Sequence, residues 1–215
     1  MLHGRNLATL AALAALLLAA APLAQAHQGN PDYRSVVTGV GPHATGIRVR
    51  ALGFDDRLEL TNRSGKTVVI TGYEREPYAR ILADGAVQVN VNSPATYLNE
   101  DRYGEATPPA GAQARAEPEW KTLDRAGTFQ WHDHRAHWMG RGLPPKVKDQ
   151  SRKTRVFDYR IPISIDGRPG TIAGTLYWVG ASNSGVPAAA IVAMVVVILA
   201  AVALVLVVRR RRKPR

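Results

Sequence analysis

Residues 57–71 read RLELTNRSGKTVVIT, and this stretch indicates β-structure. Leu58 and Leu60 alternate with a glutamate, so both leucines would point to one face of an extended strand. Turn-forming residues follow at 62–65, and the alternation resumes at Val68. The pattern predicts two strands that are joined as a hairpin through residues 62–65.

Short apolar runs of this kind recur every eight to twelve residues along much of the chain, as expected of a β-sandwich or β-barrel. Turn residues at 84–85 and at 166–170 predict two further hairpins. The predicted strands lie at 35–38, 46–52, 57–60, 67–71, 79–83, 86–91, 128–133, 155–163 and 171–179.

Two segments between these runs show no periodicity. Residues 92–120 are rich in Pro, Ala, Gly and Glu, which predicts a long surface connection that could include a helical turn. A second loop is expected at 140–153. The acidic pairs at 55–56 and 100–101 lack the ligand spacing of a calcium loop, so we expect solvated turns there.

The composition excludes several functions. The 215-residue chain has no cysteine, which rules out disulfides, thiolate-bound zinc, iron–sulfur clusters and blue-copper sites with a Cys ligand. Its net charge of +11 comes mostly from one end, because six of the 28 lysines and arginines lie in residues 209–215. The other bases are scattered among acids, so we exclude nucleic acid as a partner.

The N-terminal end is typical of a secretory signal peptide. An apolar stretch follows Arg5 and closes with Ala24-Gln25-Ala26, which predicts a signal peptide over residues 1–26. An uncleaved membrane anchor is the alternative. Cleavage after Ala26 would make His27 the first residue of the mature chain.

The C-terminal end predicts a membrane anchor. Residues 186–208 carry no charge over 23 positions, which is long enough for one helical crossing of a bilayer. The basic tail at 209–215 would stay in the cytoplasm, since positive charge flanks the cytoplasmic side. We therefore expect a single-pass cell-membrane protein in which the 182–185 linker joins the helix to an extracytoplasmic β-domain at 27–181.

Histidines cluster in one window, because residues 127–140 read GTFQWHDHRAHWMG. On a strand, His132 and His134 would share a face and could offer two imidazoles to one ion. His137 could fold back from the following loop, and the thioether of Met139 would favour copper(I). The window predicts a metal site, most plausibly for copper, with zinc also possible.

His27 would add a further donor set after cleavage, since its free amine and imidazole can chelate one ion when the amine is deprotonated. The sequence does not fix whether His27 meets the other histidines. The alternative interpretation is that the histidines brace a loop through hydrogen bonds and stacking, with Asp133 and Arg135 as ordinary surface partners.

The run from Gly127 to His134 resembles the strand and loop that carry copper ligands in cupredoxins and multicopper oxidases. By that resemblance, His134, His137 and Met139 would take the places of the Cys, His and Met ligands. Because His134 stands at the Cys position, blue-copper electron transfer is not implied. A secreted β-domain that starts with His27 is also similar to periplasmic copper-resistance proteins of the CopC type.

Taken together, the strand pattern and the uncharged C-terminal stretch predict an all-β fold, an immunoglobulin-like or cupredoxin-like β-sandwich ectodomain plus one C-terminal transmembrane helix. No hydrolase pattern is complete and no Gly-Xaa-Ser-Xaa-Gly elbow occurs, so we do not expect an enzyme. The sequence predicts a membrane-anchored extracytoplasmic protein for copper handling or delivery. The alternative is a structural or interaction ectodomain that docks onto another envelope protein and has a histidine-braced loop.

Overall fold

The computed structural model describes residues 29–43, 45–181 and 188–211. The chain divides into two compact units, and one of them spans His27–Ser182. The described residues of this unit hold all the strands, whereas the other unit contains the C-terminal helix.

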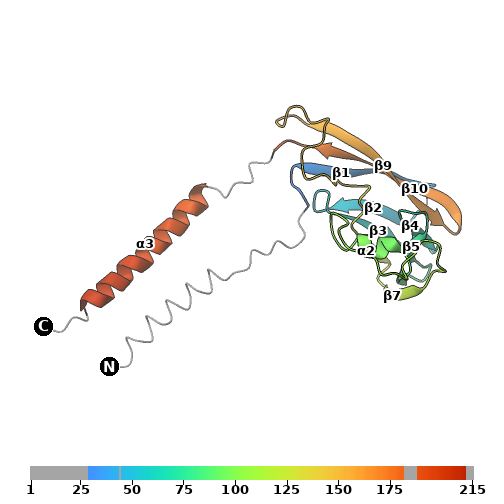
Figure 1. The fold of residues 1–215 in the computed structure, drawn as a ribbon, viewed down its shortest axis with the longest axis horizontal. Helices are drawn as coiled ribbons and strands as arrows, with labels where there is room; N and C mark the ends of the chain where they lie inside the picture. Colours follow the sequence, from blue (N-terminus) through green and yellow to red (C-terminus); the bar gives the residue numbers. More distant parts are fainter. Residues whose placement is uncertain (1–28, 44, 182–187, 212–215) are drawn as a thin grey trace, which may run out of the picture. The chain divides into compact units, whose positions relative to one another are not determined.

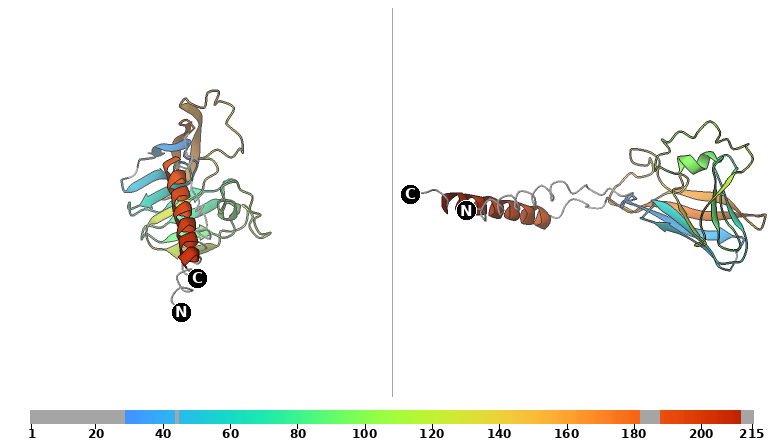
Figure 2. Two further views of the ribbon diagram at one scale, coloured as in Figure 1. Left: turned by 90° about the vertical axis from the view of Figure 1, so that its left-hand side faces the viewer. Right: turned by 90° about the horizontal axis from the view of Figure 1, so that it is seen from below.

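Two antiparallel sheets form the larger unit (Figures 1 and 2). A seven-stranded sheet has the order β1-β10-β9-β4-β5-β6-β7, and a three-stranded sheet has the order β2-β3-β8. The predicted all-β class is confirmed. The elements are β1 (Tyr33–Gly41), β2 (Ile47–Leu52), β3 (Arg57–Asn62), β4 (Val68–Thr71), β5 (Pro77–Ile81), β6 (Val87–Asn90), α2 (Pro94–Leu98), β7 (Trp120–Asp124), β8 (Thr128–Trp131), β9 (Thr154–Ile165) and β10 (Arg168–Trp178).

The main hydrophobic core lies between the two sheets. Alternate residues of each strand point inward, so Leu58 and Leu60 of β3 meet Ile70 of β4 and Ile161 of β9 in one buried cluster. A smaller cluster around Trp178 packs β1, β9 and β10 together with Val147 of the 140–153 loop.

The hairpin predicted through residues 62–65 is wrong. β3 and β4 lie in different sheets, because β3 pairs with β2 and β8 whereas β4 pairs with β5 and β9. The alternation correctly marks which side chains are buried. It does not identify the neighbouring strand, and residues 63–67 are long enough to carry the chain across the core. The hairpins predicted at 84–85 and at 166–170 are confirmed by the β5–β6 and β9–β10 pairings.

Two further boundaries differ from the prediction. The strand expected at 128–133 ends at Trp131, because the Asp133 side chain accepts the backbone N–H of Arg135 and closes a turn. His132 and His134 therefore do not share a face of one strand. β7 was not expected within or after the 92–120 segment, since this edge strand is largely exposed and shows no apolar alternation.

The C-terminal helix α3 spans Ala188–Arg211. A search of the described residues found no helix that is both long and apolar enough to cross a membrane. The predicted span at 186–208 stays a prediction. The signal peptide at 1–26, His27 and the linker at 182–185 lie outside the described residues.

Candidate functional site

The histidine-bearing loop, residues 132–138, follows β8 and is fixed by a buried ion pair. The Asp133 carboxylate accepts bonds from Trp131 Nε1 at 2.9 Å and from Arg135 Nε at 2.8 Å. Asp133 is 1% exposed, so the interpretation of Asp133 and Arg135 as surface partners is wrong. Because the Asp133 carboxylate is paired with a guanidinium and bonded to an indole, it holds this loop in one conformation.

The same arginine ties the histidine-bearing loop to the seven-stranded sheet. Arg135 donates to Thr71 O at 3.0 Å and to Gly72 O at 3.3 Å, at the end of β4. Its guanidinium also lies 4.9 Å from the ring centroid of Tyr73. The histidine-bearing loop is thus held on the turn that connects β4 to β5.

His132 is buried at the start of the histidine-bearing loop. Its Nδ1 lies 2.8 Å from Asp56 O and 3.5 Å from Asp56 Oδ1. A carbonyl oxygen can only accept, so Nδ1 carries the hydrogen in this bond. His132 also lines a solvent-open pocket of about 260 Å³ with Arg57 and Glu100.

His134 is half-buried and is held from three sides. Its ring stacks on Tyr73 with centroids 5.4 Å apart, and the Tyr73 hydroxyl accepts the His134 backbone N–H at 3.0 Å. His134 Nε2 lies 3.0 Å from Asp101 O, so Nε2 carries the hydrogen in this bond. An added Cβ on Gly104 would lie 3.1 Å from that Nδ1.

His137 lies edge to face with His134, with ring centroids 5.6 Å apart. Its Nδ1 is 3.3 Å from Trp138 O, which leaves Nε2 as the acceptor nitrogen. That Nε2 is buried and has no hydrogen-bond partner among the described residues. Burial, assisted by the Arg102 charge, lowers the pKa of His137 to about 3, so the ring is neutral at physiological pH.

A buried charged cluster, formed by Asp55, Asp56 and Arg102, lies beside the imidazoles. Arg102 donates to Asp55 Oδ2 at 2.6 Å and approaches Asp56 Oδ1 at 3.9 Å. Asp55 Oδ1 accepts the backbone N–H of Asn30 at 2.9 Å, which ties the start of the described chain to this cluster. Both aspartates are buried, so the solvated turn predicted at 55–56 is wrong. The Asp55 carboxylate is thus stabilised by the Arg102 guanidinium and by one backbone N–H.

The predicted donors are only partly brought together. Within residues 29–43, 45–181 and 188–211, no group of three or more His, Cys, Asp or Glu side chains is arranged to hold a metal. Met139 is half-buried, and His43 is exposed and lines another pocket. His27 lies outside the described residues, so its relation to the imidazoles is not defined.

Gly104 provides a test of the space beside His134. Its φ of +66° is unfavourable for other residues, and an added Cβ would lie 2.7 Å from His134 Cε1. We expect Gly104→Ala to displace the His134 ring and to lower the free energy of unfolding by about 1–2 kcal/mol, as seen by urea denaturation. The control is Gly111→Ala, where an added Cβ meets nothing within 4 Å. An unchanged His134 ring resonance in NMR spectra of Gly104→Ala would contradict this.

Sequence reasoning missed Tyr73 as the stacking partner of His134 and missed Arg102 altogether. Both contacts are long-range, 61 residues for Tyr73 with His134 and 47 for Arg102 with Asp55, so no local spacing signals them. Within the window, the only hint of a buried polar group was that Trp131 and Asp133 lie two residues apart, on either side of His132.

Comparisons of this chain with protein-family models, with curated proteins and with solved structures gave no significant match.

Proposed function

We propose that this protein binds a transition metal ion, copper in the first place, at the imidazoles of His134 and His137, and that it handles or delivers the ion without catalysing a reaction. The observation that carries the proposal is the buried Nε2 of the neutral His137 ring, which has no hydrogen-bond partner in the described part of the chain and lies edge to face with His134. A buried acceptor without a partner costs about 1–3 kcal/mol, and a metal ion would remove that cost.

The hydrogen bonds of the rings support ligation. His132, His134 and His137 each have one ring nitrogen on a backbone carbonyl, which orients the ring and its second nitrogen. Histidines that bind metal ions usually donate their second N–H to a carbonyl or carboxylate in this way. A neutral His137 also needs no deprotonation before it binds an ion.

The types of donor also suit a copper ion. Gly104 packs against the His134 ring, so an added Cβ would lie 2.7 Å from Cε1 and 3.1 Å from Nδ1. The two imidazoles leave room in the coordination sphere for Met139, His132 or the predicted amine of His27. With imidazole donors and no thiolate in the chain, copper suits this donor set best, and zinc is the second choice.

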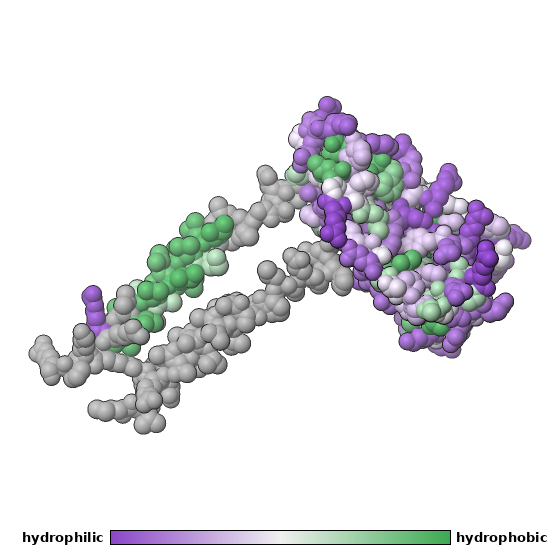
Figure 3. Space-filling view, viewed as in Figure 1, coloured by the Kyte–Doolittle hydropathy of each residue, from purple (hydrophilic) through white to green (hydrophobic). Residues whose placement is uncertain are grey.

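We further propose that the β-unit is an extracytoplasmic immunoglobulin-like or cupredoxin-like sandwich anchored in the cell membrane. Supporting this, core residues of both sheets form one cluster. The uncharged stretch 186–208 overlaps α3, and much of the side of α3 seen in Figure 3 is apolar. The signal peptide predicted at 1–26 would direct the β-unit out of the cytoplasm.

The test is a titration of the purified full-length protein in detergent with Cu(I), Cu(II) and Zn(II), in competition with a chromophoric chelator. We expect copper affinity in the micromolar range or tighter, and a loss of at least tenfold for His134→Ala and for His137→Ala. His43→Ala removes an exposed imidazole from another part of the β-unit and is the matched control. Millimolar affinity in the wild type, or equal affinity in both site variants, would refute the metal site.

One set of contacts favours a second function, an interaction ectodomain with a histidine-braced loop. His132 and His134 bond to Asp56 O and Asp101 O, 76 and 33 residues away, and so link three segments. Bracing predicts that His134→Ala loses the same thermal stability with chelator and with copper. Ligation predicts that the wild type gains stability from copper and that His134→Ala loses this gain.

A further inference from the structure

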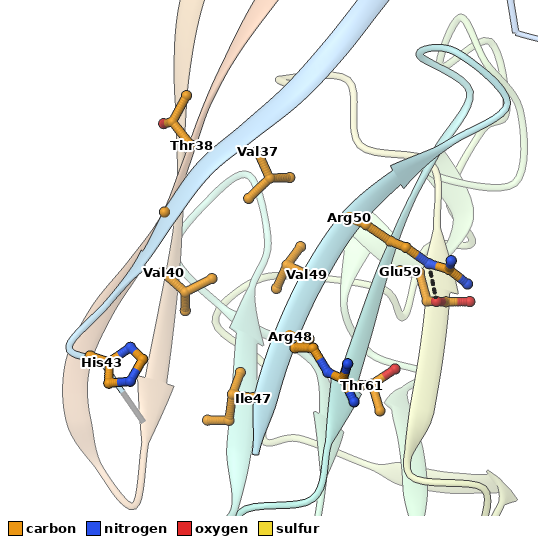
Figure 4. A pocket seen from close by; sticks show the side chains of 11 residues that line it. Val37, Thr38, Val40, His43, Ile47, Arg48, Val49, Arg50, Glu59 and Thr61 are labelled. Carbon is orange, nitrogen blue, oxygen red and sulfur yellow. Dashed lines mark hydrogen bonds and ion pairs between the residues drawn. The ribbon is translucent and has the colours of Figure 1, made fainter. Parts of the chain in front are cut away.

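The strands β1 and β2 lie side by side, yet each has a free edge. Among the described residues, β1 pairs only with β10 and β2 pairs only with β3, so these two strands are edges of different sheets. A backbone bond from Ser35 N to Phe54 O at 3.0 Å joins the start of β1 to the residues after β2. Beyond it a groove of about 590 Å³, open to solvent, separates the strands (Figure 4).

The unpaired backbone groups of both strands face this groove. The N–H of Ser35 points away from β10, toward Phe54 O. Every second residue of an antiparallel strand faces the same way, so the N–H and C=O of Val37 also point away from β10. On β2, Gly46 O accepts from Arg63 on the β3 side, so Ile47 and Val49 direct their N–H and C=O groups to the free edge. An extended segment could pair with these groups as an added strand.

The side chains give the groove an apolar floor and a basic outer rim. Val37 and Val40 of β1 and Ile47 and Val49 of β2 point into the space between the strands (Figure 4). Arg48 and Arg50 extend to the other side of β2 and are exposed.

Arg50 is bonded to Glu59 at 2.7 Å, whereas no ion pair of Arg48 occurs in the described part of the chain. A strand added at β2 would place alternate side chains on the apolar floor and beside Arg48.

We propose that the groove binds an extended segment of a partner protein in which apolar residues alternate with acidic ones, and that this segment pairs with the free edge of β2. Main-chain bonds would supply affinity, and the valine floor and Arg48 would supply specificity. A second copy of this chain fits less well. Antiparallel pairing of β2 with itself would put the arginines of both copies on one face, where like charges repel. The proposal does not depend on metal binding.

The test is fluorescence anisotropy with the full-length protein in detergent and two labelled peptides, in which valine alternates with glutamate or with lysine. We expect the acidic peptide to bind at micromolar concentration and the basic peptide to bind at least tenfold more weakly. Arg48→Glu should reverse this preference. Val49→Pro should reduce binding of both peptides at least tenfold, because it removes a groove-facing N–H and leaves the β2–β3 bonds in place.

A charge reversal outside the groove lining, Arg152→Glu in the exposed turn before β9, is the matched control and should leave both affinities unchanged. Circular dichroism establishes that each variant is folded. Three results would overturn the proposal: no binding below millimolar concentration, binding that neither Arg48→Glu nor Val49→Pro alters, or dimerisation of the unliganded protein by light scattering that Val49→Pro abolishes. The last would assign the groove to a second copy.

Discussion

The Arg102→Met variant is expected to lose about 3–5 kcal/mol of unfolding free energy at pH 7. The Asp55 side chain is fully buried, and Arg102 is its only cationic partner within 4 Å among the described residues. Methionine would keep most of the packed volume but leave a buried carboxylate without compensation. Burial already raises the pKa of Asp55, so the loss should shrink as pH falls and the unpaired carboxyl takes up a proton.

Urea denaturation at pH 7 and pH 5 measures both effects. Arg141→Met is the matched control, because Arg141 pairs with Glu105 at 2.8 Å but both side chains are largely exposed, and such pairs contribute at most about 1 kcal/mol. The double variant Asp55→Asn with Arg102→Met should recover part of the loss, since the fully buried position 55 then carries no charge. Equal stability of Arg102→Met and Arg141→Met would show that the buried charged cluster does not stabilise the fold.

The sequence predicts the elements of this fold better than their partners. Alternation at Leu58 and Leu60 identifies a strand and its buried face, and the turn at 166–170 identifies the β9–β10 hairpin. The same signal fails to place β3 and β4 in different sheets, because apolar side chains that meet across a core alternate in the same way as those of neighbouring strands.

The site shows the same limit. The window at 127–140 correctly marks a concentrated set of histidines, but the strand expected to align them ends at Trp131. What positions His134 is Tyr73 and the carbonyl of Asp101, which come from distant parts of the chain. Such contacts depend on the tertiary fold, so no spacing rule within the window could predict them.

The stability of the protein should rise with pH through the acidic range because of His137. Burial holds the pKa of His137 at about 3, below the ordinary value of 6.5. Between these values the unfolded chain binds a proton that the folded chain does not, so acid favours unfolding. The stabilising effect is complete above pH 6.5 and is lost as pH falls toward 3. The largest slope from one group is about 1.4 kcal/mol per pH unit.

The variant His137→Gln isolates this effect, since glutamine can still donate to Trp138 O but does not titrate. Urea midpoints in the presence of chelator, taken from pH 4 to pH 7, should rise more steeply for the wild type than for His137→Gln. His43→Gln removes an exposed imidazole and is the control. Parallel curves for the wild type and His137→Gln would mean that the folded ring has the same pKa as the unfolded chain. In that case burial would not keep His137 neutral in the acidic range, and the copper site would lose that support.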